Sequence, residues 1–141
     1  MSLIPVANHR ALLQDAYPKV LTVTPIAELH ADSNAVSKVC FYAVGRPKKL
    51  PKVAAVLLER CDKDSRSSGA KGRAGLAVTL DICNKLVSEC RSELSCFAEQ
   101  ILKVVELALG RQNGVERDTE IEGRAAALVS PVLGSEERRV G

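Results

Sequence analysis

Apolar residues recur at helical spacing along much of the chain, and most regularly after residue 73. The first run consists of Leu76, Leu80, Cys83, Val87 and Cys90. Steps of three and four place these positions on one helical face with polar residues between them, so the run predicts an amphipathic helix. The pattern pauses at Arg91 and Ser92 and then resumes as far as Gly110. Two antiparallel helices joined by a tight turn explain the pause better than the alternative, a single bent helix.

Other helices are predicted where helical patterns coincide with start and stop signals. They cover residues 5–16, 33–44, 48–60 and 119–129. The pair Tyr17-Pro18 ends the first of them, because a residue before proline avoids the helical conformation. Asp32 or Ser33 can cap the second helix. In the third, Pro51 falls in the first turn, where its missing N–H does no harm.

The last predicted helix begins at Thr119, which has capping-box spacing with Glu122, and ends before Pro131. A flexible basic linker is expected over residues 62–75, DKDSRSSGAKGRAG. Its glycines match neither GxxxxGK nor GxGxxG, so they do not indicate a nucleotide site. The chain therefore divides into a short N-terminal helix and loop (1–32), helical-repeat hairpins (33–130) and a disordered tail (131–141).

The composition favours packed helices over a β-sandwich. Hydrophobic residues make up 46% of the 141 residues, but aromatic residues only 3%, and Trp is absent. A core of Leu, Val and Ala suits amphipathic helices that stack in pairs. We expect an all-α fold of stacked helical hairpins, the start of a HEAT- or armadillo-like solenoid. A short solenoid should leave apolar surface exposed at its ends.

Catalytic and metal-binding signals are weak. The two histidines lie far upstream of Cys83 and Cys90, the five cysteines form no CxxC pair, and no nucleophile–base group or carboxylate pair is legible. Cys83 and Cys90 are better explained as small buried hydrophobes than as metal ligands. We therefore expect no enzyme activity, metal or cofactor. No run of 18 apolar residues occurs, so no membrane-spanning helix is expected.

Positive charge is concentrated in the first half of the chain. Residues 1–75 carry 12 Lys or Arg against 6 acids, whereas residues 76–141 carry 8 against 11. On the predicted helix from residue 48, five cations would share about a third of the helical circumference: Lys48, Lys49, Lys52, Arg60 and Lys63. Such a stripe is either a solvated surface or a site for phosphate on lipid or RNA. Anionic lipid is the better fit, because RNA binding normally adds exposed aromatic residues for stacking.

Three blocks resemble the amino-terminal region of the Eighty-five-requiring family, whose animal member is called Rolling blackout. They are NHRALLQDAYP (8–18), VCFYAVGRPKKLPKVAAVLLER (39–60) and RAGLAVTLDICNKLVSECRSELSCFAEQIL (73–102). Their order and spacing are similar to those of fungal members. Family members are several times longer, so we expect this chain to be a fragment that carries the membrane-facing end.

The resemblance implies a non-catalytic, peripheral scaffold on the cytoplasmic face of the plasma membrane. Family members hold a type III phosphatidylinositol 4-kinase there through a tetratricopeptide-repeat adaptor, which supports synthesis of phosphatidylinositol 4-phosphate. Fungal members bind anionic phospholipid through a basic patch. By position, the patch in this chain would comprise Arg10, Arg46, Lys48, Lys49, Lys52, Arg60 and Lys63. No cysteine precedes Cys40, so palmitoylation near the start is not expected.

Two other readings of the chain remain. The first is a soluble α-helical module that binds nucleic acid or a protein. The second is a truncated product without function.

Overall fold

The computed structural model describes residues 9–18, 28–67, 70–111 and 119–140, and these ranges contain helices and no strand. The α-helices are α1 (His9–Asp15), α2 (Ser33–Val44), α3 (Leu50–Arg66), α4 (Ala70–Glu89), α5 (Ala98–Arg111) and α6 (Thr119–Val140). Two short 3₁₀ segments, η2 (Pro47–Lys49) and η3 (Arg91–Cys96), lie between them.

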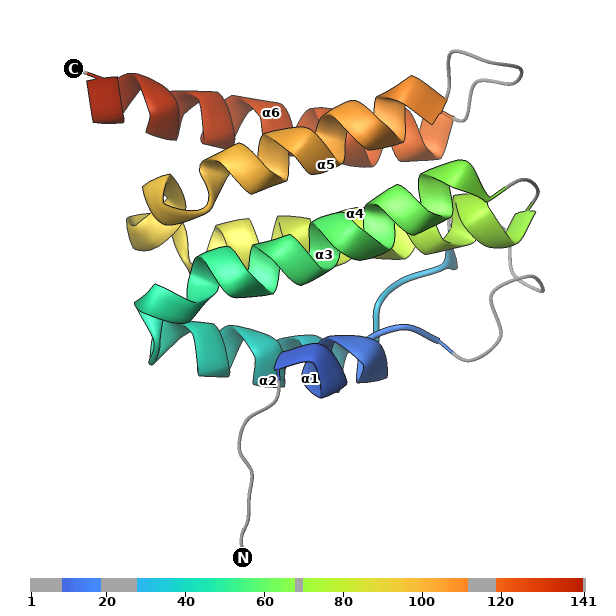
Figure 1. Cartoon of the computed structure of the whole chain (residues 1–141), viewed down its shortest axis with the longest axis horizontal. Helices are drawn as coiled ribbons and strands as arrows, with labels where there is room; N and C mark the ends of the chain where they lie inside the picture. Colours follow the sequence, from blue (N-terminus) through green and yellow to red (C-terminus); the bar gives the residue numbers. More distant parts are fainter. Residues whose placement is uncertain (1–8, 19–27, 68–69, 112–118, 141) are drawn as a thin grey trace, which may run out of the picture.

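The helices form three stacked hairpins, α1–α2, α3–α4 and α5–α6 (Figure 1). Helix α3 packs against α1 and α5 in one layer, and α4 packs against α2 and α6 in the other. Each hairpin thus contacts the next through both of its helices, as in a helical solenoid. The predicted all-α fold of stacked hairpins is confirmed.

Local sequence signals explain most of the helix boundaries. Of the two predicted caps of α2, the structure uses Asp32, whose side chain accepts a hydrogen bond from the Ala35 N–H at 3.0 Å. Helix α1 ends at Asp15, just before Tyr17-Pro18 as predicted. Between α4 and α5 the chain turns through η3, so the two-helix interpretation is correct and the single bent helix is wrong.

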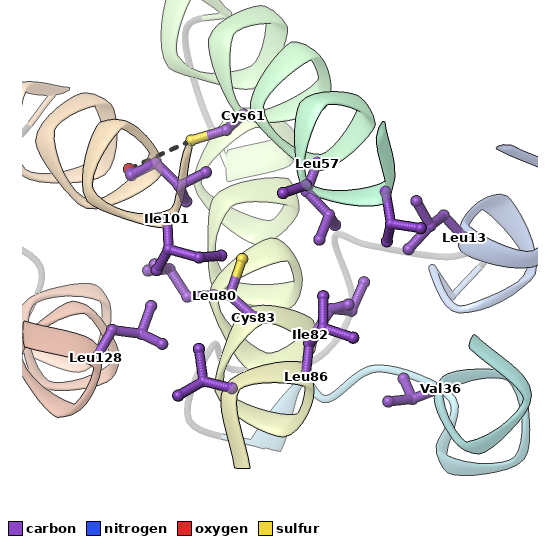
Figure 2. Close-up of a cluster of buried hydrophobic side chains, with 14 of the residues drawn as sticks. Leu13, Val36, Leu57, Cys61, Leu80, Ile82, Cys83, Leu86, Ile101 and Leu128 are labelled. Atoms are coloured by element: carbon purple, nitrogen blue, oxygen red, sulfur yellow. Dashed lines mark hydrogen bonds between the residues drawn. The ribbon is translucent and has the colours of Figure 1, made fainter. Parts of the chain in front are cut away.

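The hydrophobic core surrounds α4, the central helix of its layer. Figure 2 shows side chains from every hairpin meeting there. The labelled ones are Leu13, Val36, Leu57, Cys61, Leu80, Ile82, Cys83, Leu86, Ile101 and Leu128. An amphipathic helix was predicted here, but every position of α4 from residue 74 to residue 80 is buried. This part of the helix is therefore covered on all sides.

A buried arginine adds a polar link between α4 and α6. Arg124 donates from Nε to Glu120 in its own helix at 2.8 Å and from Nη1 to the carbonyl of Ala77 in α4 at 2.9 Å. In return, Asn84 Nδ2 donates to the carbonyl of Arg124 at 3.1 Å. These bonds satisfy polar groups that would be costly to bury alone, and they fix how α6 lies along α4.

The predicted linker over residues 62–75 is wrong, because α3 continues to Arg66 and α4 begins at Ala70. Glycines in this stretch serve close packing and not flexibility. A Cβ on Gly72 would lie 2.6 Å from the carbonyl oxygen of Ser67 and 2.9 Å from that of Asp64. A Cβ on Gly75 would lie 2.5 Å from Cγ of Asp64. Only glycine allows the end of α3 to approach the start of α4 this closely.

Helix α6 also extends beyond its predicted end at Val129 and continues through Pro131 to Val140. Proline inside a helix costs about 3 kcal/mol, because it removes one hydrogen bond and crowds the preceding turn. Leu128 and Val132 on either side of it are both completely buried, and this packing offsets the cost. The predicted division at residue 131 therefore does not coincide with a helix end.

Substituting Gly72 by Ala tests the close approach of α3 and α4. We expect the free energy of unfolding to fall by about 1–3 kcal/mol, because the new methyl group meets two backbone carbonyls that cannot swing aside. The matched control is Gly123→Ala in α6, where nothing lies within 4 Å and a gain of about 0.5–1 kcal/mol is expected. Urea unfolding followed by circular dichroism measures both, and equal gains would contradict the packing role of Gly72.

Candidate functional site

Four of the predicted lipid-binding cations lie together where α2 passes into α3. Helix α2 ends at Val44, and the chain then turns through Gly45 and η2 before α3 begins at Leu50. The turn is held by backbone hydrogen bonds from the N–H of Arg46 to Ala43 at 3.0 Å and from the N–H of Lys49 to Arg46 at 2.8 Å. We call the cations of this turn and of the first turn of α3, Arg46, Lys48, Lys49 and Lys52, the basic corner.

The basic corner is rigidly placed but open to solvent. Leu50 and Val53 are completely buried and fasten the first turn of α3 to the core. Lys48 and Lys52 are exposed, and Lys49 is half-buried. Lys48 and Lys49 belong to the 3₁₀ turn and not to the same helix as Lys52, so the predicted five-cation stripe on one α-helix is wrong.

The sequence on either side of the corner carries charge of one sign. Residues 33–58 contain five Lys or Arg and no Asp or Glu. The guanidinium of Arg46 lies over the ring of the buried Tyr42, 4.6 Å from its centroid, and this stacking orients the side chain without neutralising it. The corner therefore carries positive charge that no acid between residues 33 and 58 offsets, while η3, which contains Glu93, packs against η2 from another part of the sequence.

The remaining predicted cations, Arg10, Arg60 and Lys63, line a separate groove between α1 and α3 with a volume of about 280 Å³. Arg10 pairs there with Glu59 through contacts of 2.7 and 3.3 Å. The hydrogen bond and the charge of Arg10 lower the pKa of Glu59, and the pKa of Arg10 is raised in turn. Both side chains are exposed, so solvent screens this pair.

Arg60 has a structural role. Its Nε donates to the Asp64 carboxylate at 2.9 Å, and its guanidinium lies 4.0 Å from the ring centroid of Tyr17. The Tyr17 hydroxyl forms a hydrogen bond with the buried Thr79 of α4. Burial raises the pKa of Tyr17, which keeps this phenol neutral. Arg60 thus holds α1, α3 and α4 together, and its charge is largely used within the protein.

Four of the five cysteines are buried, where a reactive role is not supported. Of the five, only Cys96 is exposed, and none forms a disulfide. Burial raises the pKa of Cys40 and of Cys61 to about 12. It also raises the pKa of Cys83 and of Cys90. In the described ranges no three His, Cys, Asp or Glu side chains are grouped so that they could hold a metal ion.

Sequence reasoning missed two apolar side chains beside the basic corner. Phe41 is 82% exposed and Val44 is 56% exposed. The signal was available in α2, because Phe41 follows the solvent-facing positions Asn34, Ser37 and Lys38 at helical spacing. The buried face of α2 instead carries residues such as Val36 and Val39.

The comparisons with known proteins agree with this fold. Residues 36–116 match the family model described as EFR3, armadillo repeat. Protein EFR3 of Mycosarcoma maydis is 34% identical over 135 residues, which cover 88% of this chain and 13% of that protein. Protein EFR3 of Cryptococcus neoformans is 32% identical over 127 residues, 83% of this chain and 12% of that protein. Protein EFR3 of Saccharomyces cerevisiae is 28% identical over 106 residues, 75% of this chain and 13% of that protein. No solved structure matches the chain.

Together, the stacked hairpins and the armadillo match define a helical-repeat protein of the armadillo class. The chain belongs to the EFR3 family, which confirms the resemblance found in its amino-terminal blocks. It spans roughly an eighth of the length of these relatives. None of the helices in the described ranges is both long and apolar enough to cross a bilayer.

The burial of the thiols predicts that the native protein reacts rapidly with a thiol reagent at one position only. Ellman's reagent at neutral pH should titrate Cys96 at once and all five thiols only after unfolding in guanidinium chloride. Cys96→Ser is the control and should abolish the fast phase. A fast phase that persists in this variant would contradict the burial of the other four.

Arg60→Ala should destabilise the protein by about 1–3 kcal/mol, because it removes the stacking on Tyr17 and deprives the buried Asp64 of a charged hydrogen bond. Lys52→Ala removes a cation from an exposed position of the same helix and should change stability by less than about 0.5 kcal/mol. Thermal and urea unfolding compare the two variants. Similar small effects would show that Arg60 is only a surface charge.

Proposed function

We propose that this chain is a peripheral membrane scaffold that binds anionic phospholipid through the basic corner, at the cytoplasmic face of the plasma membrane. The observation that carries the proposal is the corner itself, with four cations where α2 passes through η2 into α3 and no acid between residues 33 and 58. Phosphate-bearing headgroups are the chemical partner for such a surface, because they match its charge over an extended plane.

The expected free energy of binding favours reversible attachment to the membrane. Each Lys or Arg near an anionic leaflet contributes about 1 kcal/mol, so four give about 4 kcal/mol, equivalent to millimolar binding. Arg10 and Arg60 add less than the sequence suggested, since Glu59 and Asp64 offset their charges. A surface of this strength recruits a protein to a membrane in a salt-dependent way and does not anchor it permanently.

RNA is a weaker candidate for the same charge. Single-stranded RNA is usually gripped by several exposed aromatic rings on which bases stack. The chain has four aromatic residues, of which Tyr42 and Phe97 are buried and Tyr17 lies beneath Arg60. Phe41 alone offers an open ring, which does not make a stacking platform.

The family resemblance extends the proposal from the lipid to a protein complex. A scaffold of this family would hold a tetratricopeptide-repeat adaptor and, through it, a phosphatidylinositol 4-kinase beside its substrate lipid. Within that assembly this chain would supply the membrane contact. The adaptor and kinase contacts remain a proposal for the longer family proteins.

Charge reversal at the basic corner tests the lipid contact. Lys48→Glu combined with Lys52→Glu should lower the affinity for phosphatidylserine vesicles by roughly thirtyfold or more, because two cations of about 1 kcal/mol each are lost. The measurement is vesicle co-sedimentation at low and physiological salt, with neutral vesicles as the baseline. Both lysines are exposed, so circular dichroism should show an unchanged fold.

The matched control is Lys71→Glu combined with Lys103→Glu, which changes the net charge equally at exposed positions of α4 and α5. Its affinity should fall much less than that of the corner variant. Equal losses would mean that net charge and not the corner attracts the vesicles. Tighter binding to RNA than to anionic vesicles would overturn the proposal in favour of a nucleic-acid module.

A further inference from the structure

Two large apolar side chains stand in solvent at the end of α2. Phe41 is 82% exposed and Val44 is 56% exposed, and among the described residues the only other large hydrophobic side chain classed as exposed is Leu133 in α6. Most apolar residues of this chain are buried in the core, so two neighbouring exceptions one helical turn apart form a surface feature.

The packing of α2 holds these side chains outward. Cys40 and Tyr42, on either side of Phe41, are 5% and 6% exposed, and Ala43 beside Val44 is completely buried. Rotating the helix to hide Phe41 would therefore pull three core side chains into water. The orientation is fixed, and the described part of the chain supplies nothing that covers the pair.

The basic corner follows these residues directly. Val44 is the last residue of α2, and Arg46 lies two positions later with its backbone N–H bonded to Ala43. The segment from Phe41 to Lys52 thus presents two apolar side chains and four cations with no acid. An anionic bilayer is the partner that satisfies both, because its headgroups attract the cations while its interface accepts apolar side chains.

We infer that Phe41 and Val44 insert into the boundary between headgroups and acyl chains when the basic corner binds an anionic membrane. This inference rests on the proposed function. It adds to the free energy of membrane binding a second contribution, which does not depend on salt. A second copy of this chain is a poorer partner, because pairing the same surface would bring eight cations of two corners together.

A single-tryptophan variant reports the insertion directly, because the chain contains no Trp. Phe41→Trp should shift its fluorescence to shorter wavelength on adding phosphatidylserine vesicles, and lipids brominated on the upper acyl chain should quench it. The matched control is Leu133→Trp, an exposed apolar position on α6, in the hairpin farthest from α2 (Figure 1). Its emission should stay that of a solvated indole.

Affinity provides the second readout. Phe41→Ser should weaken vesicle binding by about tenfold, because it removes a ring that would be buried in the membrane. The slope of affinity against salt should stay unchanged, because the substitution removes no charge. Lys48→Glu combined with Lys52→Glu should instead reduce the slope itself. The two variants therefore separate the apolar contribution from the ionic one.

The outcomes distinguish the inference from the proposed function. Salt-sensitive binding of Phe41→Trp without a spectral shift or quenching would overturn insertion and leave the lipid-binding function standing. Absence of binding to anionic vesicles by the unmodified chain would overturn both. A shift that depends on protein concentration without vesicles would show that Phe41 is covered by another copy, and would overturn insertion into lipid.

Discussion

The close approach of α3 and α4 at Gly72 and Gly75 is the constraint on which the arrangement of the molecule depends. With no side chains in the way, the end of α3 lies against the start of α4, and Asp64 is buried between them. That carboxylate binds Arg60, whose guanidinium supports the ring of Tyr17. A backbone contact between two helices thus determines where the N-terminal hairpin is attached.

The cations of the predicted patch are of two kinds. Arg10 and Arg60 have carboxylate partners that come from α3, and Arg46 stacks on Tyr42. The planar guanidinium suits such stacked and bidentate contacts, whereas an ammonium group remains well hydrated at the surface. Lys48 and Lys52 are correspondingly exposed. The arginines of the predicted patch therefore make contacts within the protein, whereas Lys48 and Lys52 remain accessible to a binding partner.

The sequence predicted the fold better than the site. Periodicity and capping residues located the helices because these signals act over a few residues. Residues 62–75 were misjudged as a linker because glycines and charges indicate a loop locally, while their actual role arises from packing between α3 and α4. The pair between Arg10 and Glu59 joins positions 49 residues apart, which no local pattern reveals. Phe41 could have been found, since helical spacing alone places it on the polar side of α2.

The location of the basic corner also determines how membrane binding and repeat stacking can coexist. Repeats stack through the faces of their helices, as α3 does on α5 and α4 on α6. The corner instead occupies the connection between the first and second hairpins, at one side of the stack (Figure 1). A further hairpin packed on α5 and α6 would lie at the opposite end of the stack from α2, which carries Phe41. Because such a hairpin would contact neither α2 nor η2, stacking at that end and membrane binding at the corner would not compete for the same surface.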